Sequence, residues 1–420
     1  MVKILAVKAR QILDSRGNPT VECDIKTSIG ISRASVPSGA STGSHEAMEL
    51  RDNGKIFFGQ GVLRVVENIN KKIAPKLKGL DPADQKEIDK VLIHLDGTAN
   101  KSKLGANALL AASMAAARAG ALALEVPLYE HIACLFGTKK ITLPVPAFNI
   151  INGGKHAGNK IDVQEYMVMP VGAKNFAEAL QIGSEVYHAL KQKLLNDFGK
   201  SAINVGDEGG FAPPFTCIEE PLEAISAVID NLGYGNKAKL GMDCAASTFW
   251  KGGKYYLEGK EHTADQLKNV YEELVKTYPL ISIEDPFMEE DFEHFSELKR
   301  WTNVQVVGDD LLCTNPKRIN AAIAKRSCNC LLLKVNQIGT LTEAFKAAAL
   351  AYSDKWNVMV SHRSGETEDN FIADLSVGIA SQFIKAGAPC RGERLAKYNQ
   401  LLRIEEETKA PYAGKNFRLP

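Results

Sequence analysis

Three short apolar runs each end in a charged residue, and the charges are evenly spaced. Residues 280–283 lead into Glu284, residues 304–308 into Asp309, and residues 331–333 into Lys334. Successive charges are 25 residues apart (284 to 309, and 309 to 334), which is room for a strand, a helix and two short loops. In a barrel of such units, catalytic groups collect at the C-terminal ends of the strands. The pattern therefore predicts a barrel with two carboxylates and a lysine at its active edge.

A third carboxylate, Asp243, ends the strand expected at residues 239–242. Three converging carboxylates repel one another unless a cation lies among them. An oxygen-rich site with few histidines favours Mg²⁺ or Mn²⁺ over Zn²⁺. Asp243, Glu284 and Asp309 are therefore candidate metal ligands. The alternative is three unrelated acids that cap helices or lie on the surface, which would not all be expected to fall at strand ends.

Lys334 follows an apolar strand, where a charged side chain is costly unless it is paired or functional. A nearby metal and a second cation would lower its pKa and make it a usable base. The alternative is a lysine that reaches solvent from a strand edge. Lys385, on the last expected strand, would be the second cation or a group that binds a carboxylate.

Two further carboxyls could complete an acid and base pair. Glu208 lies between glycines, and Glu165 follows the glycine-rich loop at residues 152–159. Two carboxyls near a lysine could divide the acid and base roles. His156, in the same loop, could contact a substrate, although a lone loop histidine is more often incidental. This loop and residues 37–46 contain the small residues expected of lids.

Residues 361–369 follow an expected strand and open a helix. Arg363, Ser364 and the backbone N–H groups there could hold a phosphate at the helix N-terminus. Many loops contain Arg-Ser-Gly, so the segment taken alone is only a moderate indication.

The elements that must position these residues form two parts. Residues 1–35 alternate as in an antiparallel meander with a turn at Asp14, and residues 104–124 form an alanine-rich interior helix. Residues 1–134 therefore read as an α+β N-terminal domain. Residues 135–420 read as a β/α barrel with strands and helices in alternation, including a short strand at residues 202–205.

The composition is that of an ordinary soluble globular protein. The 420 residues carry 51 basic and 50 acidic side chains, a net charge of +1, which favours neither nucleic acid nor an anionic membrane as partner. No apolar run approaches the roughly 20 residues that span a bilayer, and the first residues lack the apolar core of a signal peptide. Eight scattered cysteines read as reduced core residues and predict a cytoplasmic location.

Several stretches in the same order resemble one family, the enolases, over essentially the whole chain. The matching motifs lie at residues 37–43, 206–213, 282–287, 331–340 and 361–369. The resemblance implies an enolase-type fold and a hydro-lyase of glycolysis and gluconeogenesis. The implied reaction is the reversible dehydration of 2-phospho-D-glycerate to phosphoenolpyruvate.

The resemblance also implies roles for the candidates. Lys334 would remove the proton from C2, and Glu208, assisted by Glu165, would protonate the departing hydroxyl. A lysine or histidine base beside Mg²⁺ is established for the enolase superfamily. The implied binding residues are, for the first Mg²⁺, Asp243, Glu284 and Asp309; for the second, Ser41; and for substrate, His156, His362, Arg363, Ser364 and Lys385. A homodimer, or an octamer built of dimers, is the implied assembly.

The chain departs from the usual enolase pattern near the last strand. Phe383 lengthens the approach to Lys385 by one residue, and Ala386 and Gly392 replace hydroxyl residues. Two alternatives to an enolase stay open. One is another superfamily enzyme, such as a racemase or a sugar-acid dehydratase, and the other is a protein of the same fold kept for binding or scaffolding.

Overall fold

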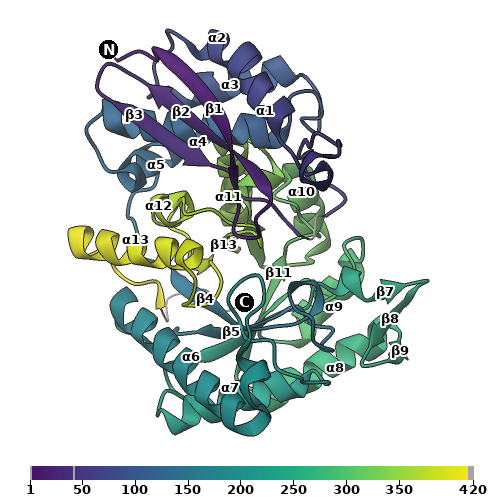
Figure 1. Ribbon diagram of the computed structural model, residues 1–420. Coiled ribbons are helices and arrows are strands. Elements are labelled where there is room, and N and C mark those ends of the chain that lie inside the picture. Colours follow the sequence, from purple (N-terminus) through teal and green to yellow (C-terminus); the bar gives the residue numbers. More distant parts are fainter. Residues whose placement is uncertain (1, 41–42, 415–420) are drawn as a thin grey trace.

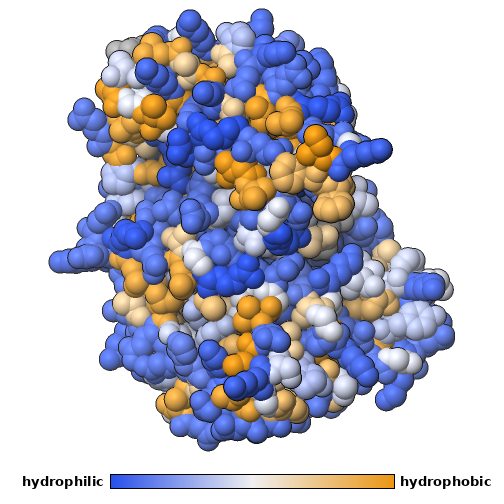
Figure 2. Space-filling view, viewed as in Figure 1, coloured by the Kyte–Doolittle hydropathy of each residue, from blue (hydrophilic) through white to orange (hydrophobic). Residues whose placement is uncertain are grey.

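The computed structural model describes residues 2–40 and 43–414. The fold consists of two parts (Figure 1). A small sheet with helices lies at the N-terminal end, and a closed eight-stranded barrel ringed by helices forms the rest. On the face shown in Figure 2, apolar residues form small groups among hydrophilic ones. This is the ordinary pattern of a surface in contact with water.

The N-terminal sheet is the predicted antiparallel meander. Its strands are β1 (Ala6–Leu13), β2 (Pro19–Lys26) and β3 (Ile31–Ser35), in the order β1-β2-β3. In the turn between β1 and β2, the Asp14 carboxylate accepts hydrogen bonds from the backbone N–H groups of Arg16 and Asn18, and Gly17 has a positive φ of 77°. Aspartate and glycine are the residues that such a turn requires, so the sequence sets this turn locally.

The predicted interior helix is α4 (Ala106–Ala123), and nearly all of its side chains are buried. It packs on β2, β3, α3 (Gln85–Asp96) and α5 (Leu128–Phe136). The short helical stretches before it are η1 (Ile56–Gly59), α1 (Leu63–Glu67), η2 (Asn68–Ile73) and α2 (Ala74–Leu77). Among the described residues, α4 alone is long and apolar enough to cross a membrane. Its small residues allow close packing on every side, so its apolar character is that of a core helix.

The barrel strands follow the order β10-β11-β12-β13-β14-β4-β5-β6, which closes on itself. Their bounds are β4 (Val145–Asn152), β5 (Glu165–Met169), β6 (Lys239–Asp243), β10 (Leu280–Glu284), β11 (Gln305–Gly308), β12 (Cys330–Leu333), β13 (Asn357–Ser361) and β14 (Phe383–Lys385). The outer helices are α6 (Phe176–Phe198), α7 (Glu219–Asn231), α8 (Ala264–Thr277), α9 (Phe292–Trp301), α10 (Pro316–Lys325), α11 (Leu341–Ser353), α12 (Phe371–Gly378) and α13 (Gly392–Thr408). The enolase-type barrel predicted from the sequence is thus confirmed.

Strict alternation of strand and helix was the wrong prediction for the start of the barrel. β4 and β5 pair antiparallel with no helix between them, and β5 also pairs antiparallel with β6. The connection, residues 153–164, contains only the short helical turn η3 (Gly154–His156). Antiparallel neighbours need no crossover helix, so the chain returns directly and β5 begins at the edge where β4 ends.

The strand predicted at residues 202–205 is also wrong, because Lys200–Ile203 forms a 3-10 turn, η4. A hairpin follows Asp243. Its strands are β7 (Trp250–Lys251), β8 (Lys254–Leu257) and β9 (Lys260–His262), with Gly252 and Gly253 at the first turn. Phe383 lies in the barrel wall, where it pairs with Met359 and Val145.

Candidate active site

The predicted site residues converge at one edge of the barrel. Asp243 and Glu284 end two neighbouring strands and are register partners, and Asp309 and Lys334 directly follow the next two strands. Glu165 is the first residue of β5, yet it is paired with Asp243 because β5 runs antiparallel. The reversed strand therefore adds a buried carboxylate to the edge where parallel strands end.

Lys385 holds three of these carboxylates together. Its Nζ lies 3.1 Å from Asp243 Oδ2, 2.8 Å from Glu284 Oε1 and 3.2 Å from Glu165 Oε2. Burial alone would lower the pKa of Lys385, but the facing carboxylates outweigh it and raise the pKa well above its ordinary value. Lys385 is therefore the cation that offsets the negative charge of these carboxylates.

Lys334 is paired with Asp309 through its Nζ and Oδ2 atoms. The Asp309 Oδ1 atom accepts a hydrogen bond of 2.9 Å from Gln337 Nε2. Burial would lower the pKa of Lys334, but the Asp309 carboxylate outweighs burial and raises this pKa above its ordinary value. Beside Asp309, Lys334 is thus held in its charged form.

The three expected metal ligands are not the acids that are grouped together most clearly. Among the described residues, one set of three carboxylates has oxygens that all lie within 4.8 Å of one another, and it consists of Asp285, Asp309 and Asp310. The Nζ atom of Lys385 forms ion pairs with Asp243 and Glu284, and the Nζ atom of Lys334 forms one with Asp309. The donors nevertheless suit a hard cation, because all are carboxylate oxygens. Glu284 Oε2 is buried without a hydrogen-bond partner, and burial and the Asp243 charge raise the pKa of Glu284 well above its ordinary value.

Asp285 is a residue that the spacing argument did not find. Its carboxylate accepts the backbone N–H groups of Asp309 (2.9 Å) and Asp310 (2.7 Å). Asp285 directly follows β10, and these hydrogen bonds hold the backbone that follows β11 beside it. The only local signal is a second acid directly after Glu284, and such a pair also occurs at ordinary strand ends.

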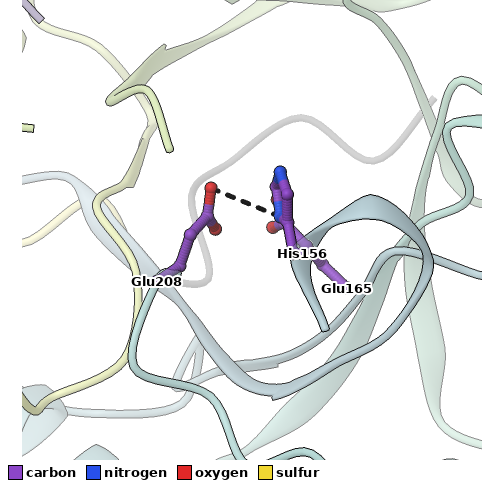
Figure 3. Close-up of side chains that lie close together, drawn as sticks. All are labelled: His156, Glu165 and Glu208. Atoms are coloured by element: carbon purple, nitrogen blue, oxygen red, sulfur yellow. Dashed lines mark ion pairs between the residues drawn. The ribbon is translucent and has the colours of Figure 1, made fainter. Parts of the chain in front are cut away.

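Glu165, Glu208 and His156 face one another on the acid side of the pocket (Figure 3). His156 Nδ1 lies 3.5 Å from Glu208 Oε1 and 3.6 Å from Glu165 Oε1. Burial lowers the pKa of His156, so the ring is neutral at pH 7. Asn149, also missed, donates a 2.9 Å hydrogen bond from Nδ2 to Glu208 Oε2.

The two glutamates have pKa values shifted in opposite directions. Burial, and then the Glu208 charge, raise the pKa of Glu165 well above its ordinary value. Burial acts on Glu208 in the same sense, but interactions with His362, His156 and the Arg394 guanidinium outweigh it and lower the pKa of Glu208. A proton shared by the two glutamates is therefore held more tightly by Glu165 than by Glu208.

The segment at residues 361–366 is joined to the N-terminal part of the chain. Arg363 Nη1 donates to Glu46 Oε2 (2.9 Å) and Asn336 Oδ1 (3.0 Å), and Ser364 Oγ accepts the backbone N–H of Ala40 (2.7 Å). Glu46 lies in the predicted lid but was not recognised as a partner. Ser41, the expected ligand of a second metal, lies outside the described residues.

One pocket brings the residues around Lys334, the two glutamates and Arg363 together. Its lining residues are His156, Gln164, Glu165, Glu208, Asp243, Lys334, Ser361, His362, Arg363, Ser364 and Lys385. Lysine, carboxyls and an arginine around one cavity are suited to proton abstraction and elimination on an anionic substrate.

Two protein-family models match the chain. Residues 4–132 match the model described as the enolase N-terminal domain. Residues 140–420 match the model described as the enolase C-terminal TIM barrel domain. Together the matches cover both parts of the fold.

We expect Lys385→Met to destabilise the metal-free protein in a pH-dependent way. Removal of one partner of a buried ion pair costs about 3–5 kcal/mol. The loss should be largest at pH 8 and smaller at pH 5, because Glu165 and Glu284, which lose Lys385, have raised pKa values and take up protons as the pH falls. Urea unfolding in EDTA at both pH values measures this.

The control is Lys193→Met, which removes a partly exposed partner of Asp197 on α6. Its effect should be small and almost independent of pH. An equal loss for Lys385→Met at both pH values would contradict the electrostatic role of Lys385.

Proposed function

The chain belongs to the enolase family, and on that premise we propose that it dehydrates 2-phospho-D-glycerate reversibly to phosphoenolpyruvate. Family membership makes the chain a dehydratase of the enolase superfamily. The observation that carries the choice of substrate is the pocket itself. Lys334, Glu165 and Glu208 line it together with Arg363 and Ser364.

Lys334 is the base in this proposal. Its amine takes the proton from C2 of the substrate, so it must first lose its own proton. The charges of Arg363 and Lys385 favour that loss and the Asp309 carboxylate opposes it. The ammonium formed by the transfer remains beside Asp309, which stabilises it.

Glu208 is the acid, with Glu165 as the store of its proton. The hydroxyl at C3 leaves as water once Glu208 gives it a proton, and the C2–C3 double bond forms. The carboxylate oxygens of the two glutamates lie within 4.8 Å, close enough for one water to bridge them. The proton that burial keeps on Glu165 can thus reach Glu208.

Arg363 and Ser364 are proposed to bind the phosphate of the substrate, and His362 is proposed to line the pocket. Arg363 and Ser364 already make hydrogen bonds to Glu46 and Ala40, so substrate binding has to exchange these contacts. Asp243, Glu284 and Asp309 would hold one Mg²⁺ and Ser41 would contribute to a second. When bound, Mg²⁺ supplies electrostatic stabilisation of negative charge on the substrate carboxylate.

The test is the ultraviolet absorbance of phosphoenolpyruvate after 2-phosphoglycerate and Mg²⁺ are added to the purified chain. We expect the absorbance to grow, to stop in EDTA and to resume when Mg²⁺ is restored in excess. No growth, with Mg²⁺ binding intact by calorimetry, would instead favour another superfamily reaction or a binding protein of the same fold.

Variants at Lys334 and Glu208 should separate the two halves of the reaction. Lys334→Ala should abolish exchange of the C2 proton with solvent, a loss of about 10²–10⁴-fold, while Mg²⁺ binding persists. Glu208→Gln should stop water loss yet retain exchange at C2, because the base is intact. Deuterium exchange followed by NMR measures the first step. Persistent exchange in Lys334→Ala would mean that another group is the base.

We also propose that the chain forms a homodimer, as the family resemblance implies. A charged groove between β2–β3 and the α12–α13 region supports this. It contains residues of both signs, including Glu22, Arg33, Arg118 and Glu393, and such a surface can complement its own copy across a two-fold axis.

Light scattering should give about twice the 45.7 kDa of one chain. Arg33→Glu should weaken the dimer, whereas Lys140→Glu, on an exposed residue outside the groove, should not. A monomeric wild-type protein at micromolar concentration would contradict the proposal.

The cytoplasmic location remains a prediction from the cysteines.

A further inference from the structure

Arg394, in the first turn of α13, is a fully buried guanidinium that the proposed reaction does not use. Its nearest carboxylate oxygen, Glu393 Oε1, lies 3.4 Å from Nε, and neither atom has a hydrogen-bond partner. A buried cation is costly unless other groups compensate for the lost water. Here the compensation comes from backbone carbonyls and one imidazole.

The hydrogen bonds of Arg394 reach two separate loops of the pocket. Nη1 donates to Arg363 O (2.7 Å), while Nη2 donates to Asp207 O (2.9 Å) and Ser364 O (2.6 Å). The loop of Glu208 and the loop of Arg363 are thereby tied to the same planar group. A guanidinium suits this task because its donors have a fixed geometry.

The fourth contact of Arg394 determines the chemistry of a neighbouring ring. Nη1 lies 2.7 Å from His362 Nδ1. A guanidinium can only donate hydrogen bonds, so Nδ1 must accept and carries no proton. In a neutral imidazole the proton then resides on Nε2.

The Nε2 atom of His362 lies near the proposed acid. It is buried, lies 3.3 Å from Glu208 Oε2, and has no hydrogen-bond partner among residues 2–40 and 43–414. The charged groups that face the ring are Glu208, Arg394 and Lys385. Burial lowers the pKa of His362 to about 3 despite the Glu208 carboxylate, so the ring is neutral at any pH where the enzyme would work.

We propose that Arg394 is a positioning residue that fixes His362 as its Nε2–H tautomer and so aims an N–H at the Glu208 carboxylate. The other tautomer would present a lone pair to that carboxylate and repel it. The Nε2–H can instead steady Glu208 in its ionised form, which arises when Glu208 gives up its proton to the leaving hydroxyl. This role rests on the proposed function, whereas the tautomer itself does not.

The experiment reads the tautomer directly. The full chain is labelled with ¹⁵N-histidine, and long-range ¹H–¹⁵N spectra are recorded from pH 5 to 8 without substrate. The His362 signals are assigned as those missing from His362→Gln. We expect a protonated Nε2 and an unprotonated Nδ1, constant over this range. A proton on Nδ1, or a ring that titrates, would overturn the proposal.

Arg394→Met removes the donors and the charge, and Arg394→Lys keeps the charge with a single donating atom. In Arg394→Met the His362 signals should become a mixture of tautomers or titrate, and kcat should fall by about 10²-fold, as for a misplaced catalytic group. Arg394→Lys should restore part of the single-tautomer spectrum of His362 and part of kcat. If Arg394→Met does not fold, the comparison of Arg394→Lys with the wild-type protein is the test. A fall in kcat with an unchanged His362 spectrum would show a purely structural role and overturn the proposal.

Arg391→Met is the matched control. Arg391 donates to the carbonyls of Gly206 and Ser15 and pairs with Glu393 Oε1 (2.8 Å), and its hydrogen bonds and ion pairs do not include His362. It therefore loosens the Glu208 loop without touching the ring, and the His362 spectrum should stay unchanged. A shifted tautomer in this control would assign the effect to the loop rather than to Arg394. If the wild-type spectrum is as expected but 2-phosphoglycerate is not converted, the proposed function fails while the tautomer assignment stands.

Discussion

The rest of the structure depends on one constraint, which is that several carboxylates are buried side by side. Asp243, Glu284 and Glu165 converge at one barrel edge where water is excluded, and each would be costly to ionise alone. Lys385 lies within hydrogen-bonding distance of all three. Removal of any one partner would leave an uncompensated charge, so the strands that carry these residues have little freedom to shift in register.

The N-terminal part of the chain serves the same site. Ser38 and Gly365 exchange two backbone hydrogen bonds, and the Ser38 hydroxyl donates to the Asp14 carboxylate that also shapes the β1–β2 turn. Glu46 extends this contact to Arg363. The wall of the pocket is therefore built from both parts of the fold, which explains why a barrel edge alone does not enclose it.

The two ends of the pocket differ in how they hold protons. At one end Asp309 keeps Lys334 charged. At the other, burial raises the pKa of Glu165, whereas His362, His156 and Arg394 lower the pKa of Glu208. Similar carboxyls thus take different roles because their neighbours differ, and a dehydratase needs such a division between acid and base.

The sequence by itself determined the features that depend on neighbouring residues. These include the turn at Asp14, the buried alanine-rich helix α4, and the placement of Glu284, Asp309 and Lys334 at successive strand ends. It also indicated the pocket residues, since charges at strand ends meet at one edge of a barrel. Only the tertiary structure decided which partner each charge has. The reversed direction of β5, Lys385 among three acids, Asp285 beneath Asp309, and Arg394 on His362 all join residues from distant segments, and no local pattern encodes contacts that arise when the barrel closes.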